Sequence, residues 1–373
     1  MERNGNGAVT VLGGALPPLW DREADDRLVC TRVVDETHDV KTFAFRAEPP
    51  RLFRQLPGQY ITLDLPVGAE TVTRSYTISS SPLTPDELAI TVKRVPGGPG
   101  SNWLHDHLKP GMSLGALGPG GEFSCLLPAP KPDAKYLFLS AGSGITPMMA
   151  MTRTLHGLAP GSSIAFVHSA RTPADLIFRA ELEALARRDA GLTLGFIVES
   201  RAGDAGWAGL TGRLSLDALR LLCPDYAARE VYVCGPTPYM QAARALLEAG
   251  GLPAAQYHEE SFDFATLMAA GAAEVEPELP AAPVAAAAFT VRLSRSRREF
   301  SCQPGQTVLE AARAAGVAVP ASCSKGVCGT CKAKLLEGSV EMKANGGIRQ
   351  KEVDAGMRLL CCSVPTSDVV VER

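Results

Sequence analysis

Four cysteines near the end of the chain have the spacing of a metal-cluster site. They are Cys323, Cys328, Cys331 and Cys361, of which the first three follow the pattern C-x4-C-x2-C. Two ferric ions with bridging sulfides need four soft anionic ligands, which a tight loop and a distant fourth thiolate can supply. The alternatives are two disulfides or a zinc site, but zinc prefers paired C-x2-C knuckles. The spacing therefore predicts a [2Fe–2S] cluster held by these four residues.

The residues around these cysteines predict the elements that hold them. Gly326 and Gly329 allow the loop to adopt positive φ and bring backbone amides close to the sulfurs. Thr307 is expected to cap a short amphipathic helix ahead of the loop. Residues 332–342 are expected to form a hairpin after it.

The closing segment, residues 360–369, resembles that of plant-type ferredoxins, in which a cysteine stands four residues before Pro-Thr-Ser-Asp. The resemblance assigns the fourth ligand to Cys361, with Cys362 as a buried neighbour that could exchange roles with it. It implies a β-grasp α+β ferredoxin domain over residues 289–373.

Length and charge limit the possible domain organisation of the whole chain. A chain of 373 residues is too long for one core and suggests two or three domains. From Phe289 onward the chain has 13 Lys and Arg and 8 Asp and Glu, a formal charge of +5. The remainder has 37 − 13 = 24 Lys and Arg and 40 − 8 = 32 Asp and Glu, a formal charge of −8. Plant-type ferredoxins are usually acidic, so this basic domain departs from the family.

Composition also excludes several classes of protein. No apolar run is long enough to cross a bilayer, and the N-terminus lacks a basic-then-apolar signal, so we expect a cytoplasmic protein without membrane attachment. The arginines at residues 292–298 lie on an alternating strand and are expected to form a solvated face, so nucleic-acid binding is not expected. Residues 266–288 are rich in Ala, Pro and Glu and are expected to be a linker.

Short strands separated by Pro and Gly over residues 28–130 predict an antiparallel β-barrel. Most of residues 1–27 is expected to be a loosely packed extension. Within the barrel, Arg74 can bind two oxygens of a pyrophosphate, Tyr76 offers a flat ring, and Thr77 offers a hydroxyl near flavin N5. This segment resembles the Arg-x-Tyr-Ser/Thr signature of the ferredoxin–NADP reductase family, which implies a flavin.

A glycine-rich segment after this motif predicts a second flavin contact. Its helix start, with Ser101 expected as cap, would expose backbone N–H groups to a phosphate. The resemblance favours FAD over FMN, because Gly121-Glu122-Phe123 stands where FMN-binding relatives carry Asn-Phe. The predicted flavin contacts are Arg74, Ser75, Tyr76, Thr77, Lys93, Gly100, Ser101 and Asn102.

Alternating strands and helices over residues 131–265 predict a doubly wound α/β domain. Its glycine turn resembles the family's Gly-x-Gly-x-Thr-Pro variant, and a second strand-to-helix turn resembles its Cys-Gly-Pro motif, in which the cysteine lies beside the nicotinamide. Cys234 and Thr77 are thus the candidate catalytic residues, although Cys234 could be only a small buried residue. The remaining predicted cofactor contacts are Gly142, Gly144, Thr146, Ser200, Arg201, Cys234, Gly235, Pro236, Met240 and Phe262, of which Ser200 and Arg201 would lie at the adenosine end of the coenzyme.

The coenzyme is expected to be NADH rather than NADPH, by a narrow margin. Arg201 would favour a 2′-phosphate, whereas Glu199 would repel it. Phe262 is expected either to shield the flavin ring or to pack against the barrel.

The domain order resembles single-chain reductase components of Rieske-type oxygenases, particularly those that demethylate betaines and related quaternary amines. The resemblance implies that NAD(P)H reduces FAD, which passes single electrons through the cluster to a separate terminal oxygenase. A hybrid-cluster protein or a di-iron oxygenase is the alternative partner, and a non-catalytic iron–sulfur sensor is the alternative class.

Overall fold

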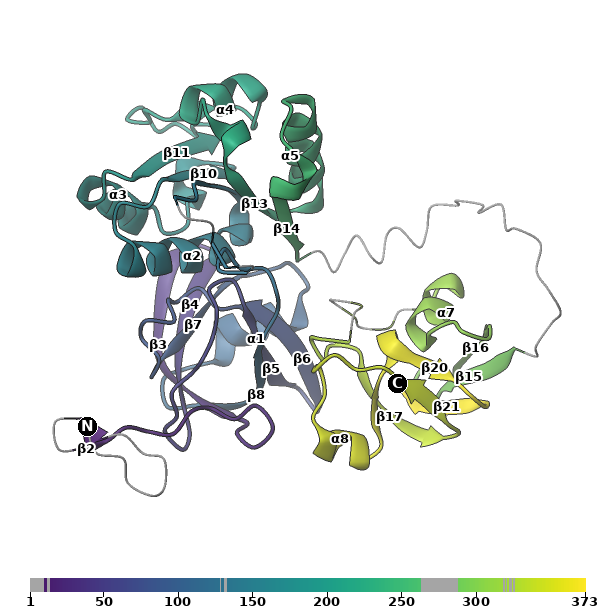
Figure 1. The fold of residues 1–373 in the computed structure, drawn as a ribbon. Coiled ribbons are helices and arrows are strands. Elements are labelled where there is room, and N and C mark those ends of the chain that lie inside the picture. The colour runs from purple at the N-terminus through teal and green to yellow at the C-terminus, as the bar shows by residue number, and fades with distance from the viewer. Residues whose placement is uncertain are drawn as a thin grey trace. The chain divides into compact units, whose positions relative to one another are not determined.

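The computed structural model describes residues 10–11, 14–127, 129–130, 133–262, 288–317, 319, 321, 324 and 326–373. The predicted ligand Cys323 and almost all of the predicted linker, residues 266–288, lie outside this described part. The chain divides into two compact units, the first ending at Phe262 and the second containing the C-terminal domain (Figure 1). No helix among the described residues is both long enough and apolar enough to cross a membrane.

The first unit begins with an antiparallel β-barrel, as the sequence predicts. Its elements are β3 (Arg27–Thr37), β4 (Val40–Ala47), β5 (Tyr60–Val67), β6 (Glu70–Thr77), β7 (Leu88–Lys93), α1 (Pro99–His107) and β8 (Ser113–Gly120). The strands pair in the order β6-β5-β8-β3-β4-β7, and a bridge between Ile78 and Ile90 joins the two ends of the sheet. Phe43, Phe45 and Ile61 are fully buried in the core that the closed sheet encloses.

The segment before the barrel is anchored to it, although the sequence predicts a mostly loose extension. Strands β1 (Thr10–Val11) and β2 (Gly14–Ala15) form a small sheet. Further on, the Trp20 indole N–H donates to the Gly118 carbonyl at 2.7 Å, and its ring lies 5.3 Å from that of Phe53. Arg51 Nε donates to both carboxylate oxygens of Asp25 at 3.0 and 2.9 Å. Because single anchors create no hydrophobic period, the sequence pattern does not reveal them.

A doubly wound α/β layer completes the first unit. Its strands are β9 (Tyr136–Ala141), β10 (Ile164–Ala170), β11 (Leu192–Val198), β12 (Leu210–Thr211), β13 (Glu230–Gly235) and β14 (Tyr257–Ser261). They are parallel, in the order β12-β11-β10-β9-β13-β14. Its helices are α2 (Ile145–Leu158), α3 (Arg179–Arg188), α4 (Leu216–Leu222) and α5 (Thr237–Ala249).

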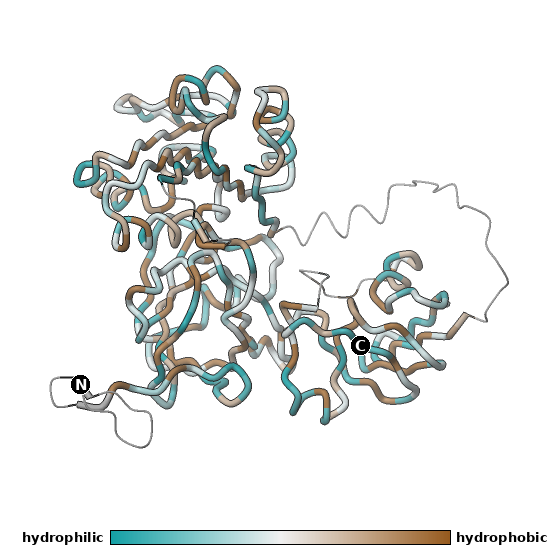
Figure 2. The backbone as a smooth tube through the Cα atoms, in the orientation of Figure 1, coloured by the Kyte–Doolittle hydropathy of each residue, from teal (hydrophilic) through white to brown (hydrophobic). Residues whose placement is uncertain are grey.

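Helices cover both faces of this sheet, which explains why its central strands are apolar on both sides. Phe138 and Phe166 pack with residues of α2 and α3, whereas Leu137 and Leu139 pack with residues of α4 and α5. Figure 2 shows the hydrophobic stretches that run along these strands. The strand order reverses at β9, so the carboxyl ends of β9 and β13 form the switch point where such sheets bind ligands.

The second unit is a small α+β domain of the predicted β-grasp type. Its elements are β15 (Phe289–Leu293), β16 (Arg298–Cys302), α7 (Val308–Ala314), β17 (Lys332–Glu337), β18 (Val340–Met342), α8 (Gln350–Asp354), β19 (Met357–Leu359), β20 (Ser363–Pro365) and β21 (Val369–Glu372). Thr307 caps α7 and forms a reciprocal capping box with Glu310, which confirms the predicted helix start.

The hairpin predicted at residues 332–342 is wrong. Strand β17 pairs with β19 and β21 in a five-stranded sheet, whereas β18 pairs with β20 in a separate two-stranded sheet. A Cβ atom on Gly338 would lie 2.0 Å from the Asp368 carbonyl oxygen, so the chain passes close to a distant segment at the expected turn. Long-range pairing thus overrides the local turn signal.

Candidate cofactor sites

The loop after residue 325 brings predicted cluster ligands to the base of β17. Cys328 and Cys331 are 2% exposed, and Cys361 is 8% exposed. The Gly326 amide donates to Cys361 Sγ at 3.2 Å, and the Leu360 amide donates to the Cys331 carbonyl at 3.2 Å. None of these three thiols forms a disulfide. The fourth predicted ligand, Cys323, lies outside the described residues.

Glycines set the shape of this loop. Gly326 has φ 71° and Gly329 has φ 76°, in the region that favours glycine. The Gly326 carbonyl accepts from the amides of Asn345 and Gly347 at 3.0 and 2.9 Å, so a neighbouring segment supports the loop. Soft sulfur donors with a backbone amide aimed at one of them fit a [2Fe–2S] cluster, because such hydrogen bonds stabilise negative charge on the sulfur.

The adjacent cysteines at the fourth position have different surroundings. Cys361 is buried and accepts the Gly326 N–H, whereas the half-buried Cys362 thiol lies 3.6 Å from the Leu359 carbonyl, its acceptor. This arrangement supports Cys361 as the ligand.

The predicted flavin motif occupies the end of β6. Arg74 and Tyr76 alternate with Ser75 and Thr77, so the two pairs point to opposite faces of the sheet. Tyr76 packs partly against the barrel core, and Thr77 is 7% exposed. Arg74 Nη1 donates to the Thr73 carbonyl at 2.8 Å.

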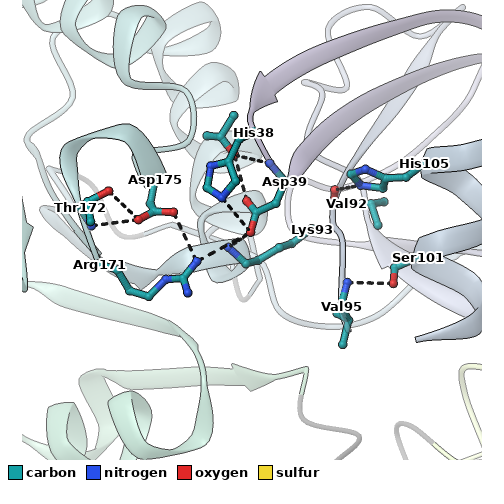
Figure 3. A network of polar contacts seen from close by, with 11 residues as sticks. His38, Asp39, Val92, Lys93, Val95, Ser101, His105, Arg171, Thr172 and Asp175 are labelled. Carbon is teal, nitrogen blue, oxygen red and sulfur yellow. Dashed lines mark hydrogen bonds and ion pairs between the residues drawn. The ribbon is translucent and has the colours of Figure 1, made fainter. Parts of the chain in front are cut away.

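Helix α1 offers an anion-binding end, but Ser101 is not its cap, contrary to the sequence prediction. The cap residue is Gly98, and no side chain caps the helix. Ser101 Oγ instead accepts from the Val95 amide at 3.1 Å (Figure 3). The amides of Gly100 and Ser101 lie in the first turn, where helix geometry provides no intrahelical acceptor, and Asn102 follows. An uncapped helix start fits the pyrophosphate of FAD.

Lys93, another predicted flavin contact, is held by a residue that the sequence did not reveal. Its Nζ lies 2.8 Å from Asp39 Oδ2, in the turn between β3 and β4 (Figure 3). Burial raises the pKa of Asp39, but the hydrogen bond and charge of Lys93, with contributions from Thr37 and His38, lower it below its usual value overall. A partly buried carboxylate is thus paired with a lysine beside the expected flavin site.

The acidic cluster around Asp39 is not a metal site. His38, Asp39 and Asp175 have ligand atoms close enough to share a cation. However, Lys93 already lies 2.8 Å from Asp39, and Arg171 lies 3.8 Å from Asp39 and 3.4 Å from Asp175 (Figure 3). Two cationic side chains therefore neutralise the carboxylates that a metal would need.

The two turns predicted to bind nicotinamide meet in the structure. Gly142 has φ 52° between β9 and α2. A Cβ atom on Gly144 would lie 2.3 Å from the Cys234 carbonyl oxygen and 2.5 Å from the Gly235 nitrogen. Only glycine allows this backbone approach, which joins the ends of β9 and β13 at the switch point. Thr146 Oγ1 donates to the Ser143 carbonyl at 3.1 Å and steadies the turn.

Cys234 is fully buried next to an acidic residue that the sequence analysis missed. Glu260 on β14 is its register partner across the sheet. Burial, and then the charge of Glu260, raise the pKa of the Cys234 thiol well above its usual value, so the thiol is neutral. Burial also raises the pKa of Glu260 to about 8, and its Oε2 has no hydrogen-bond partner within the described part of the chain. The signal available beforehand was an acid two residues before Phe262.

Two further hydroxyls lie near this end of the sheet, on Tyr239 of α5 and on Ser169 of β10. Burial raises the pKa of Tyr239. A hydrogen-bonding interaction with Ser169 lowers this pKa and the charge of Cys234 raises it, both by less than burial does. Neither the Tyr239 hydroxyl nor Ser169 Oγ makes a hydrogen bond of normal geometry to any described residue.

The predicted adenosine contacts follow β11. Ser200 Oγ accepts from the Ala202 amide at 3.2 Å, and Arg201 is exposed. Glu199 forms an ion pair with Arg213 at 3.3 Å. The carboxylate that argued against a coenzyme phosphate is therefore partly neutralised.

The remaining predicted contacts lie around the start of α5 and after β14. Pro236 is the N-cap residue of α5 and follows Gly235 directly. Met240 is 5% exposed and packs in the core beneath the sheet, and Phe262 is 39% exposed. A coenzyme contact of Met240 and a role for Phe262 both stay predictions.

Comparison with known proteins agrees with this geometry. A family model described as an oxidoreductase FAD-binding domain matches residues 28–125, an oxidoreductase NAD-binding domain matches 138–245, and a 2Fe-2S iron-sulfur cluster binding domain matches 291–366. The glycine betaine monooxygenase reductase subunit of Pseudomonas aeruginosa is 45% identical over 352 residues, covering 92% of this chain and 94% of that protein. The chain belongs to the family of monooxygenase reductase subunits.

Other members of this reductase family align over nearly the same length. A stachydrine N-demethylase reductase subunit of Rhizobium meliloti is 40% identical, covering 92% of this chain and 96% of the relative. The ferredoxin reductase component of a 3-ketosteroid-9-alpha-monooxygenase from Mycobacterium tuberculosis is 36% identical, covering 95% and 96%. The solved structure of phthalate dioxygenase reductase covers 94% of this chain and 98% of its own, with a TM-score of 0.55 and 26% identity. The predicted FAD, nicotinamide and [2Fe–2S] cofactors are confirmed.

Proposed function

We propose that this reductase takes electrons from NADH and passes them through FAD and the [2Fe–2S] cluster to a separate Rieske-type oxygenase that demethylates a betaine or related quaternary amine. The observation that supports this best is the close approach of Gly144 to Cys234 at the switch point, in the same compact unit as the uncapped α1. Similarity over 92% of the chain to reductase subunits of glycine betaine and stachydrine systems supports the choice of partner.

Each residue has a proposed part in this function. Arg74 and the first turn of α1 would hold the FAD pyrophosphate, and Thr77 would offer its hydroxyl to the flavin ring. Bound FAD supplies the conversion of a two-electron donor into single electrons. The Cys234 thiol, which burial keeps neutral, would pack against the nicotinamide as a small apolar group.

Glu260 would keep a proton near this site. Because burial raises its pKa to about 8, its carboxyl is protonated at neutral pH and can donate a hydrogen bond.

Cys328, Cys331 and Cys361, together with Cys323, would hold the cluster, and the Gly326 N–H would stabilise charge on Cys361. The domain boundaries 28–130, 131–265 and 289–373 are part of the same proposal.

The test uses purified protein carrying its cofactors. We expect NADH oxidation with either ferricyanide or cytochrome c as acceptor, and absorbance of both flavin and iron–sulfur cluster. Protein that binds no flavin and oxidises no NADH with either acceptor would contradict the enzyme assignment and favour an iron–sulfur sensor.

The salt dependence of electron transfer tests the proposed oxygenase partner. The C-terminal domain has a formal charge of +5 from Phe289 onward, before the charge of the cluster is counted, so an acidic docking face would attract it. Electron transfer to the oxygenase should slow as salt rises from low to moderate ionic strength, whereas ferricyanide reduction changes little. Salt-insensitive transfer to the oxygenase, or faster oxidation by a hybrid-cluster or di-iron protein, would contradict this partner.

A further inference from the structure

Helix α2 starts at the glycine turn of the nicotinamide site, and its second half lies along the barrel. A Cβ atom on Gly58 of the barrel would lie 2.8 Å from the Met151 methyl group, and one on Gly157 would lie 2.3 Å from Leu83. Ser81 Oγ and Thr154 Oγ1 are 3.3 Å apart. These contacts define a seam between α2 and barrel residues 79–83, close to the end of β6.

Arg153 is the charged residue at this seam with the most extensive contacts. Its Nη1 donates to the Ser79 carbonyl at 2.5 Å, two residues beyond Thr77. Its Nε and Nη2 donate to both oxygens of Glu181 on α3, at 2.8 and 2.6 Å. Its guanidinium also lies 4.8 Å from the centre of the Phe178 ring. One side chain thus joins the segment directly after the flavin strand β6 to two helices of the α/β layer.

The anchors of this guanidinium are themselves rigid. Ser79 is fully buried, its amide donates to the Ala89 carbonyl at 2.8 Å, and its hydroxyl lies 2.9 Å from Thr91 Oγ1. Phe178 is buried in the left-handed region with φ 57°, at the N-cap of α3. Guanidinium is planar and forms fixed forks, so it can satisfy these partners at the same time, which a flexible ammonium cannot.

We infer that Arg153 is a positioning residue that sets the spacing between the flavin strand and the nicotinamide turn. This inference rests on the proposed reduction of FAD by NADH. Arg153 lies on the helix that begins with Gly144 as its N-cap and carries Thr146 in its first turn, while its Nη1 donates to Ser79, two residues after the end of the strand that carries Thr77. A shift of one element against the other would change the alignment of donor and acceptor, to which rates are sensitive.

The test compares Arg153→Ala, Arg153→Lys and Glu181→Gln with a matched control, Arg187→Ala, which removes the same charge from an exposed position on α3. Each full-length protein, loaded with FAD, is mixed with NADH or with NADH deuterated at the transferred position. The measurements are the rate of flavin reduction at saturating coenzyme, its isotope effect, and the long-wavelength absorbance of the coenzyme–flavin complex.

We expect flavin reduction in Arg153→Ala to fall about tenfold or more, with a larger isotope effect, a weaker long-wavelength band and nearly unchanged NADH affinity. Arg153→Lys should be almost as slow because it loses the fork, and Glu181→Gln should be intermediate. Rates, isotope effects and absorbance within about twofold of Arg187→Ala in FAD-loaded variants would overturn the inference. If Arg153→Ala does not retain FAD, Arg153→Lys and Glu181→Gln test the inference by the same criteria.

The controls separate this inference from the proposed function. If the proposed function fails, the unmodified protein does not reduce its flavin with NADH. If only the inference fails, the unmodified protein and the Arg153 variants reduce flavin alike. A purely structural role would lower thermal stability or FAD content without changing the isotope effect, and that result would also overturn the inference.

Discussion

Replacing Glu260 by Gln should change the pH dependence of stability. The ordinary pKa of a glutamate carboxyl is 4.5, and burial raises that of Glu260 to about 8. Ionising this carboxyl in the folded protein therefore costs on the order of 5 kcal/mol more than in the unfolded chain. Between these two pKa values the unfolded chain releases the proton and the folded protein keeps it. The stability of the unmodified protein therefore falls, relative to Glu260→Gln, as pH rises through this window.

The expected difference can be measured by urea unfolding. Glutamine does not ionise, so the variant should gain on the order of 1 kcal/mol per pH unit over the unmodified protein between about pH 5 and 8, or roughly 3 kcal/mol in all. Trp20, Trp103 and Trp207 all lie in the first unit, so their fluorescence reports its unfolding. Glu248→Gln, at an exposed position on α5, is the matched control. If the free energy of unfolding of Glu260→Gln varied with pH in parallel with that of Glu248→Gln, the argument that burial raises the pKa of Glu260 would be refuted.

Three further outcomes test the cofactor sites. Cys328→Ser should lose cluster absorbance and electron transfer to the oxygenase, while NADH-dependent ferricyanide reduction stays within about twofold, since ferricyanide can draw on the flavin; loss of flavin reduction with FAD still bound would contradict separate sites. NADH should be preferred in kcat/KM, and Arg201→Ala should lower the value for NADPH roughly tenfold more than for NADH; a strong NADPH preference that disappears in Arg201→Ala would reverse our choice of coenzyme. Cys361→Ser should lose the cluster and Cys362→Ser should keep it, as read by visible absorbance and electron paramagnetic resonance; the opposite pattern would exchange their roles.

Local signals were sufficient where chemistry imposes a strict spacing. C-x4-C-x2-C predicted the cluster loop, because only a few residues can separate thiolates that bind one cluster. The capping box at Thr307 was likewise visible, since it depends on residues within one turn. The hairpin at 332–342 was wrong for the complementary reason. Strand pairing depends on segments that are distant in sequence, and β18 finds its partner in β20.

The proposed nicotinamide site shows the same difference between what local sequence and tertiary structure determine. Gly142, Gly144 and Cys234 were identified from two separate turns, but only the parallel sheet brings Gly144 against the Cys234 backbone. Glu260 was missed because its significance arises from burial beside Cys234, which no local pattern encodes.

The sequence by itself determined the cofactors and the order of the domains, and it predicts three ligands in the cluster loop, because these depend on residue types at short, fixed separations. Tertiary structure alone decided that Asp39 holds Lys93 and that Arg153 joins Ser79 to Glu181. These contacts join elements far apart in the chain. Their energies depend on burial and on geometry to within a few tenths of an ångström, which residue order does not specify.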